Sequence, residues 1–139
     1  MSDAPALAGY HHLGLTVSDV DRSEAWYADT FGLVRAFVEQ HDNTSGYAVV
    51  MTRPGTTFFI GLDHHEDADR QPFAAQRTGL DHLALAVTSA AEVEEWAAHF
   101  DRLGVAHDPV LITEDPMPLA LVQVRDPDGI PIEVIWTGA

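Results

Sequence analysis

The chain has 139 residues, 46% of them hydrophobic, with a net charge of −15 and no cysteine. This length and hydrophobic content suit one domain with an ordinary core. The lack of cysteine excludes disulfides, thiolate catalysis and thiolate metal ligands, and the negative charge disfavours nucleic acid and anionic membrane surfaces as partners.

The first half of the chain predicts a strand, a helix and three more strands. Residues 10–17 alternate in the period of a half-buried strand. The helix that follows has Asp21 three residues ahead of Glu24 as a capping signal, and Gly32 as its stop. The expected elements are a strand at 10–17, a helix at about 21–31, and strands at about 33–40, 46–52 and 57–62.

The second half repeats this plan after a polar stretch without periodicity. Ser89 and Glu92 form a capping box, and an apolar stripe from Val93 to Leu103 follows it. The expected elements are a linker at 63–79, a strand at 80–88, a helix from about 89 to 103, and strands at about 106–112, 119–124 and 130–136.

Two histidines begin two copies of one strand pattern. His12-Leu-Gly-Leu-Thr-Val and His82-Leu-Ala-Leu-Ala-Val are 70 residues apart, and Trp26 and Trp96 have the same spacing. A period this long is not that of a solenoid repeat. It indicates one domain, residues 1–139, with a first module at about 9–62 and a second at about 80–137.

The side chains opposite the predicted core suggest a metal site. His12 and His82 lie opposite rows of Leu and Val, and their neighbours on the same face are small. Glu133 lies on an otherwise apolar face of the last strand, where a charge is costly without a partner. A lone histidine on a strand is more often structural, but two at matched positions together with a carboxylate favour a divalent metal held by two imidazoles and one carboxylate.

Three motifs in order carry a resemblance over roughly residues 10–136: His12-Leu-Gly-Leu-Thr-Val-Ser-Asp with Trp26-Tyr27, then Gly79-Leu-Asp-His82-Leu-Ala-Leu-Ala-Val, then Asp126-Pro-Asp-Gly-Ile-Pro-Ile-Glu133. They resemble the vicinal oxygen chelate superfamily, which includes glyoxalase I, extradiol dioxygenases, fosfomycin-resistance enzymes and bleomycin-resistance proteins. The resemblance implies an α+β fold of two βαβββ modules that form a cup-like open barrel around a metal. A second chain often completes the cup.

Carried over to this chain, the family's ligand positions are His12, His82 and Glu133. The fourth position falls on Gly61, so the chain departs from the four-ligand pattern of glyoxalase I. Three ligands of this type resemble extradiol dioxygenases and fosfomycin-resistance enzymes. The residues just beyond Gly61 are candidates for a substitute ligand or base: Asp63, His64, His65 and Glu66.

The predicted function is that of a metal-dependent enzyme. The alternative is a metal-free protein that binds a small molecule. The enzyme chelates neighbouring oxygens of a small organic substrate on Fe, Mn, Ni or Zn, with Glu133 as the catalytic residue. Its chemistry is that of a glyoxalase-type lyase or isomerase, or of an extradiol-type dioxygenase. The rival is a drug-binding or sequestration protein of the bleomycin-resistance type.

The remaining expectations concern the other histidines and the setting. His41, His99 and His107 are expected on the surface, His64 and His65 in a solvated loop, and His11 on the core side of its strand. The residues Met-Ser-Asp-Ala-Pro-Ala lack the basic start and apolar stretch of a signal peptide, and no apolar run reaches a membrane span, so we expect a cytoplasmic protein. We also expect a homodimer, because an open cup with apolar edges gains from a partner.

Overall fold

The first module is a four-stranded sheet with one helix. The computed structural model describes residues 4–42 and 44–138, so part of the Met-Ser-Asp-Ala-Pro-Ala start lies outside the described residues. The strand order is β1-β4-β3-β2, with β1 parallel to β4. The elements are β1 (His12–Thr16), α1 (Val20–Phe31), β2 (Val34–Gln40), β3 (Tyr47–Thr52) and β4 (Phe59–His64).

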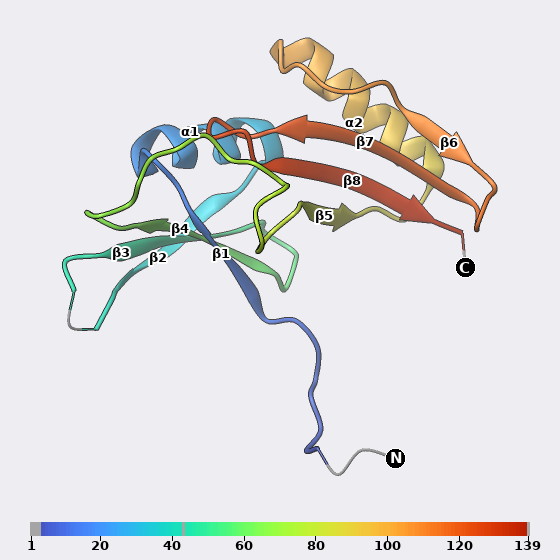
Figure 1. Ribbon diagram of the computed structural model, residues 1–139. Helices are drawn as coiled ribbons and strands as arrows, with labels where there is room; N and C mark the ends of the chain where they lie inside the picture. The colour runs from blue at the N-terminus through green and yellow to red at the C-terminus, as the bar shows by residue number, and fades with distance from the viewer. Residues whose placement is uncertain (1–3, 43, 139) are drawn as a thin grey trace.

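The second module repeats this architecture. Its strand order is β5-β8-β7-β6, with β5 parallel to β8. Figure 1 shows α2 lying over β7 and β8 on one side of this sheet. The elements are β5 (Leu83–Ala86), α2 (Ala90–Leu103), β6 (Leu111–Thr113), β7 (Leu119–Arg125) and β8 (Pro131–Thr137). The predicted α+β fold of two βαβββ modules is confirmed.

Both helices begin at a side-chain cap and end at a left-handed glycine. Ser89 caps α2 as predicted, because its hydroxyl accepts a hydrogen bond from the Glu92 amide at 3.2 Å. The cap predicted at Asp21 is wrong. The carboxylate of Asp19 accepts the hydrogen bond from the Arg22 amide at 3.0 Å, so α1 begins one residue earlier than expected.

The strand predicted at 106–112 is mostly wrong. Within this range only a single bridge between His107 and Val124, and Leu111 and Ile112 at the start of β6, pair with β7. Pro109 lacks a backbone N–H and cannot donate to a ladder, which explains why regular pairing begins only after it.

One core joins the two modules. The ring of Phe31 on α1 lies 5.5 Å from that of Trp96 and 5.9 Å from that of Phe100, both on α2. The helix-facing residues of the sheets are buried in the same core, among them Leu15, Leu62 and Val134. Each sheet therefore has one face covered by helix and one face that turns away, which we call its open face. Within the described residues, no helix is long and apolar enough to cross a membrane.

Candidate metal centre

The strand register places Gly61 and Glu133 at equivalent positions. Gly14 on β1 pairs with Gly61 on β4, and Ala84 on β5 pairs with Glu133 on β8. Since Gly14 and Ala84 are themselves separated by the repeat spacing, the structure supports the alignment of Gly61 with Glu133. The first module therefore has no side chain at the place where the second has a carboxylate.

His82 and Glu133 lie together on the open face of the second sheet. Nε2 of His82 is 3.6 Å from Oε2 of Glu133, and the two side chains are 43% and 17% exposed. The other ring nitrogen, Nδ1, donates a hydrogen bond to the Asp81 carboxylate at 2.7 Å. A histidine that ligates a metal commonly donates its second N–H to a carboxylate in this way, which fixes the tautomer and leaves Nε2 as the ligand atom.

The surroundings of His82 favour a positive charge. The hydrogen bond to Asp81 raises the pKa of His82, partial burial opposes this, and the charges of Glu133 and Asp81 add to the rise. The same two carboxylates would also attract a metal cation.

His12 lies on the open face of the first sheet, at the start of β1. Its Nδ1 is 2.9 Å from Nδ1 of His11. Among the described residues, His12 does not come together with His82 and Glu133 in one group whose ligand atoms lie within 4.8 Å of one another. The three predicted ligands are therefore divided within one chain: the structure brings His82 and Glu133 together and leaves His12 on the other sheet.

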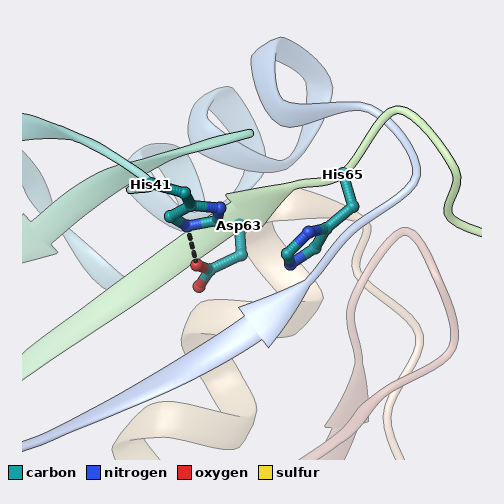
Figure 2. Close-up of side chains that lie close together, drawn as sticks. All are labelled: His41, Asp63 and His65. Carbon is teal, nitrogen blue, oxygen red and sulfur yellow. Dashed lines mark hydrogen bonds and ion pairs between the residues drawn. The ribbon is translucent and has the colours of Figure 1, made fainter. Parts of the chain in front are cut away.

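A second group of possible ligands lies on the open face of the first sheet. Ligand atoms of His41, Asp63 and His65 all lie within 4.8 Å of one another. Nε2 of His41 donates a hydrogen bond to Oδ1 of Asp63 at 2.9 Å, and Figure 2 shows the His65 ring beside this pair, with its centroid 4.9 Å from that of the His41 ring. Asp63 and His65 are among the predicted substitute ligands, whereas no pattern in the sequence indicates His41, which is 22 residues from Asp63 in the chain.

The other histidines differ from their predicted settings. His64 belongs to β4 rather than to a loop, and its ring stacks on Tyr47 at 5.1 Å. His99 is partly buried between the helices, with Nε2 2.9 Å from the carbonyl of Thr30. His11, predicted on the core side, is exposed and stacks on Phe59.

A cavity of about 660 Å³ lies on the helix side of the sheets. It is bounded by the C-terminal end of α1, by α2 and by β5, and Arg53 lies over the Trp96 ring at its wall. Its lining includes neither His82 nor Glu133. The candidate metal ligands thus lie on the open faces and not in this cavity.

Comparison with known proteins agrees with the fold. No curated protein matches the chain. Among solved structures, a glyoxylase/bleomycin resistance protein/dioxygenase domain from Frankia sp. EAN1pec has a TM-score of 0.82 at 26% identity, covering 96% of this chain and 100% of that one. A lactoylglutathione lyase from Agrobacterium tumefaciens has a TM-score of 0.66 at 22% identity, covering 94% of each chain. A glyoxalase I mutant from Zea mays has a TM-score of 0.69 at 20% identity, covering 90% of this chain and 44% of that one.

A family model provides the assignment. The model described as the Glyoxalase/Bleomycin resistance protein/Dioxygenase superfamily matches residues 9–134. This range includes the first module, the second module as far as residue 134 in β8, the two matched histidines and Glu133. The chain belongs to the glyoxalase/bleomycin resistance protein/dioxygenase superfamily.

Proposed function

We propose that the protein is a metal-dependent enzyme of the glyoxalase/dioxygenase type. The observation that carries the proposal is the approach of His82 Nε2 to Glu133 Oε2 at 3.6 Å, with Nδ1 of the same ring held by Asp81. Two imidazoles and one carboxylate, supplied by His12, His82 and Glu133, suit Fe, Mn, Ni or Zn and leave coordination positions open. Superfamily membership supports this donor set.

Each residue has a definite task in this proposal. A bound divalent ion would supply Lewis acidity to two neighbouring oxygens of a small organic substrate. His82 holds its ligand atom in one orientation because Asp81 fixes the tautomer. Glu133 is the catalytic residue: it is the less exposed of the pair, and its carboxylate can accept a proton from a substrate bound on the open face.

A homodimer would complete the site. His12 is in one sheet and the His82–Glu133 pair in the other, so the open face of the first module must meet that of a second module. A second copy of the chain offers this face, and a symmetric pair would form two equivalent sites. Large apolar side chains that remain exposed on one chain agree with such a contact: Leu7, Tyr10, Val34, Phe37, Val38, Leu111 and Ile112.

The second candidate is a metal-free small-molecule binder of the bleomycin-resistance type. One observation favours it: both ring nitrogens of His82 already face carboxylates, so the pair is satisfied without a metal. An acidic open face would then hold a cationic ligand without chemistry.

The test is metal binding by His82→Ala and Glu133→Gln, compared with the wild type and with His64→Ala as the matched control. Enzyme function predicts that the wild type and the control gain thermal stability from one of Mn, Fe, Ni or Zn, and that both site variants gain less. The metal-loaded protein is then assayed with lactoylglutathione and, for iron, with a catechol under oxygen. A wild type that gains no stability from any of the four ions would leave the binder as the better description.

A further inference from the structure

We infer that His41, Asp63 and His65 form a second divalent metal site, separate from the one proposed at His12, His82 and Glu133. The ligand atoms of the three residues lie within 4.8 Å of one another on the open face of the first sheet. The residues come from the position after β2, from β4 and from the position after β4. Figure 2 shows the His65 ring next to the hydrogen-bonded His41 and Asp63.

The spacing of the ligand atoms fits one small ion. Ligands bound at about 2.0–2.1 Å from a zinc ion cannot be more than about 4.2 Å apart. Nε2 of His41 and Oδ1 of Asp63 are already 2.9 Å apart. The ligand atom of His65 lies within 4.8 Å of the other two, so it must move nearer by no more than about 0.6 Å to bind the same ion.

Two glycines make room for the ligands. A Cβ at Gly14 would lie 2.9 Å from Oδ2 of Asp63, and a Cβ at Gly46 would lie 2.5 Å from Nδ1 of His41. Neither glycine has a positive φ, so the backbone conformation does not require glycine at either position. At Gly14 the Asp63 carboxylate is the close contact, whereas at Gly46 the backbone oxygen of His64, 2.8 Å away, would also exclude a side chain.

The carboxylate of Asp63 points back along the sheet. A Cβ at Gly61 would lie 3.3 Å from Oδ2 of Asp63, so the second carboxylate oxygen lies over the position where the first module lacks an equivalent of Glu133. Asp63 thus supplies a negative charge near that position from two residues further along β4. His41 and His65 then provide two nitrogen ligands beside this carboxylate.

The donor set defines the class of ion. Two imidazole nitrogens and one carboxylate oxygen favour transition ions such as Zn²⁺, Co²⁺ and Ni²⁺ over Mg²⁺ and Ca²⁺, which prefer oxygen. Three protein ligands leave at least one position for water or another ligand. Both sites therefore have similar donors, and only variants can distinguish them.

The experiment is a Co²⁺ titration of the tag-free protein, followed by visible absorption and equilibrium dialysis. His82→Ala removes a ligand of the first site, whereas Asp63→Asn and His65→Ala each remove one of the second. The matched control is His64→Ala, because His64 stacks on Tyr47 and lies outside the three-residue group. Far-UV circular dichroism establishes that each variant is folded.

We expect His82→Ala to retain one Co²⁺ ion. Adding Asp63→Asn or His65→Ala to His82→Ala should weaken the binding of this ion. The loss should exceed the roughly 10–100-fold that removal of an outer-shell partner costs. His64→Ala in the same background should bind as tightly as His82→Ala alone. If Asp63→Asn loses a Co²⁺ ion that His82→Ala still binds, the result supports the second site, even if the first site does not exist.

Three results would overturn the inference. His82→Ala could bind no Co²⁺, in which case the first site is the only one. Asp63→Asn and His82→Ala could each abolish all binding, which would make Asp63 a ligand of one shared site. His64→Ala could also weaken binding as much as His65→Ala, which would mean that binding follows local charge and not these three ligands.

Discussion

The hydroxyl of Tyr27 donates a hydrogen bond to the carboxylate of Asp126 at 3.0 Å, although the residues are 99 positions apart. Tyr27 belongs to α1 and is 1% exposed, and Asp126 lies in the turn between β7 and β8 and is 5% exposed. The amides of Asp128 and Ile130 each donate to the other carboxylate oxygen at 2.9 Å. This contact fixes the first module against the last hairpin of the second.

Tyr27→Phe should therefore destabilise the protein. The variant keeps the ring but leaves one buried oxygen of Asp126 without its donor, which costs about 1–3 kcal/mol in the free energy of unfolding. Chemical denaturation measures this loss. The control is Tyr47→Phe, since Tyr47 is only partly buried and should change stability by less than about 0.5 kcal/mol. Equal effects in the two variants would show that the hydrogen bond to Asp126 contributes little.

Asp126 also gives the stability a defined dependence on pH. Burial raises the pKa of Asp126 above its ordinary value of 3.8, while the hydrogen bonds from Ile130, Asp128 and Tyr27 oppose the rise. A raised carboxyl pKa means that the folded state binds the proton more tightly than the unfolded state does. The contribution of this group is therefore fully present below the unfolded pKa and is lost as pH rises through the folded pKa.

Asp126→Asn tests this sign, because the amide cannot ionise in this range. The free energy of unfolding of the wild type minus that of the variant should decrease as pH rises from about 4 and then become constant. Urea denaturation at a series of pH values gives this difference. A difference that increases over the same range would mean that the hydrogen bonds outweigh burial.

Much of the fold could be predicted because its signals are local. The alternation of Leu13 and Leu15 with small residues, and the capping box at Ser89, depend only on neighbours in the sequence, and both predicted elements are present. The wrong cap at Asp21 has a local cause as well. Asp19 and Asp21 are both acidic residues near the start of α1, and only the extended backbone at Asp19 decides between them.

The candidate site could be predicted only in part, because it depends on long-range placement. The repeat identified His12 and His82 as equivalent, but it contains no information on whether the two sheets face each other within one chain. His41 shows the same limit. Its approach to Asp63 depends on the β2–β3 hairpin and on the register of β3 with β4, and no spacing in the sequence signals it.

His107 gives the free energy of unfolding a second dependence on pH, which comes from an imidazole and not from a carboxyl group. A hydrogen bond with the Asp108 carbonyl raises the pKa of His107, partial burial opposes the rise, and Asp101 adds to it through a contact of 3.1 Å. The stabilisation from protonated His107 is therefore fully present below its ordinary pKa of about 6.5 and is lost as pH rises through the folded value.

His107→Gln should accordingly lose more stability at about pH 5.5 than at about pH 8, on either side of the ordinary histidine pKa. The loss should stay below about 1 kcal/mol, because Asp101 is largely exposed and water screens the pair. Thermal denaturation at the two pH values measures it. Asp101→Asn should remove part of the same pH dependence, and a loss that is larger at the higher pH would contradict the assignment.

The proposed dimer predicts that two inactive variants restore each other. His12→Ala and His82→Ala each lack one ligand in every site, but a mixed dimer has one site with both histidines and one site with neither. If chains exchange at random, half of the dimers are mixed, so about a quarter of the metal binding should return. The measurement is bound metal per chain after mixing, in an Asp63→Asn background that removes the second proposed site.

A site formed within one chain gives a different result in this experiment. His12→Ala and His82→Ala would then stay defective in every mixture, because no chain contains all the ligands. Light scattering must show a dimer for both variants before mixing. A monomer in both cases would contradict the proposal directly.

Gly14→Ala should disturb Asp63 without disturbing the fold. The new Cβ would lie 2.9 Å from Oδ2 of Asp63, which is the free end of a flexible side chain, so the carboxylate can turn away at a cost below about 1 kcal/mol. Turning away separates it from His41 and His65. In a Glu133→Gln background, Co²⁺ binding should therefore weaken while the thermal midpoint of the metal-free protein changes little.

Gly61→Ala is the graded control. Its new Cβ would lie 3.3 Å from the same oxygen, so this variant should weaken Co²⁺ binding less than Gly14→Ala does. Undiminished Co²⁺ binding by Gly14→Ala would mean that the position of Asp63 over these glycines is unrelated to metal binding.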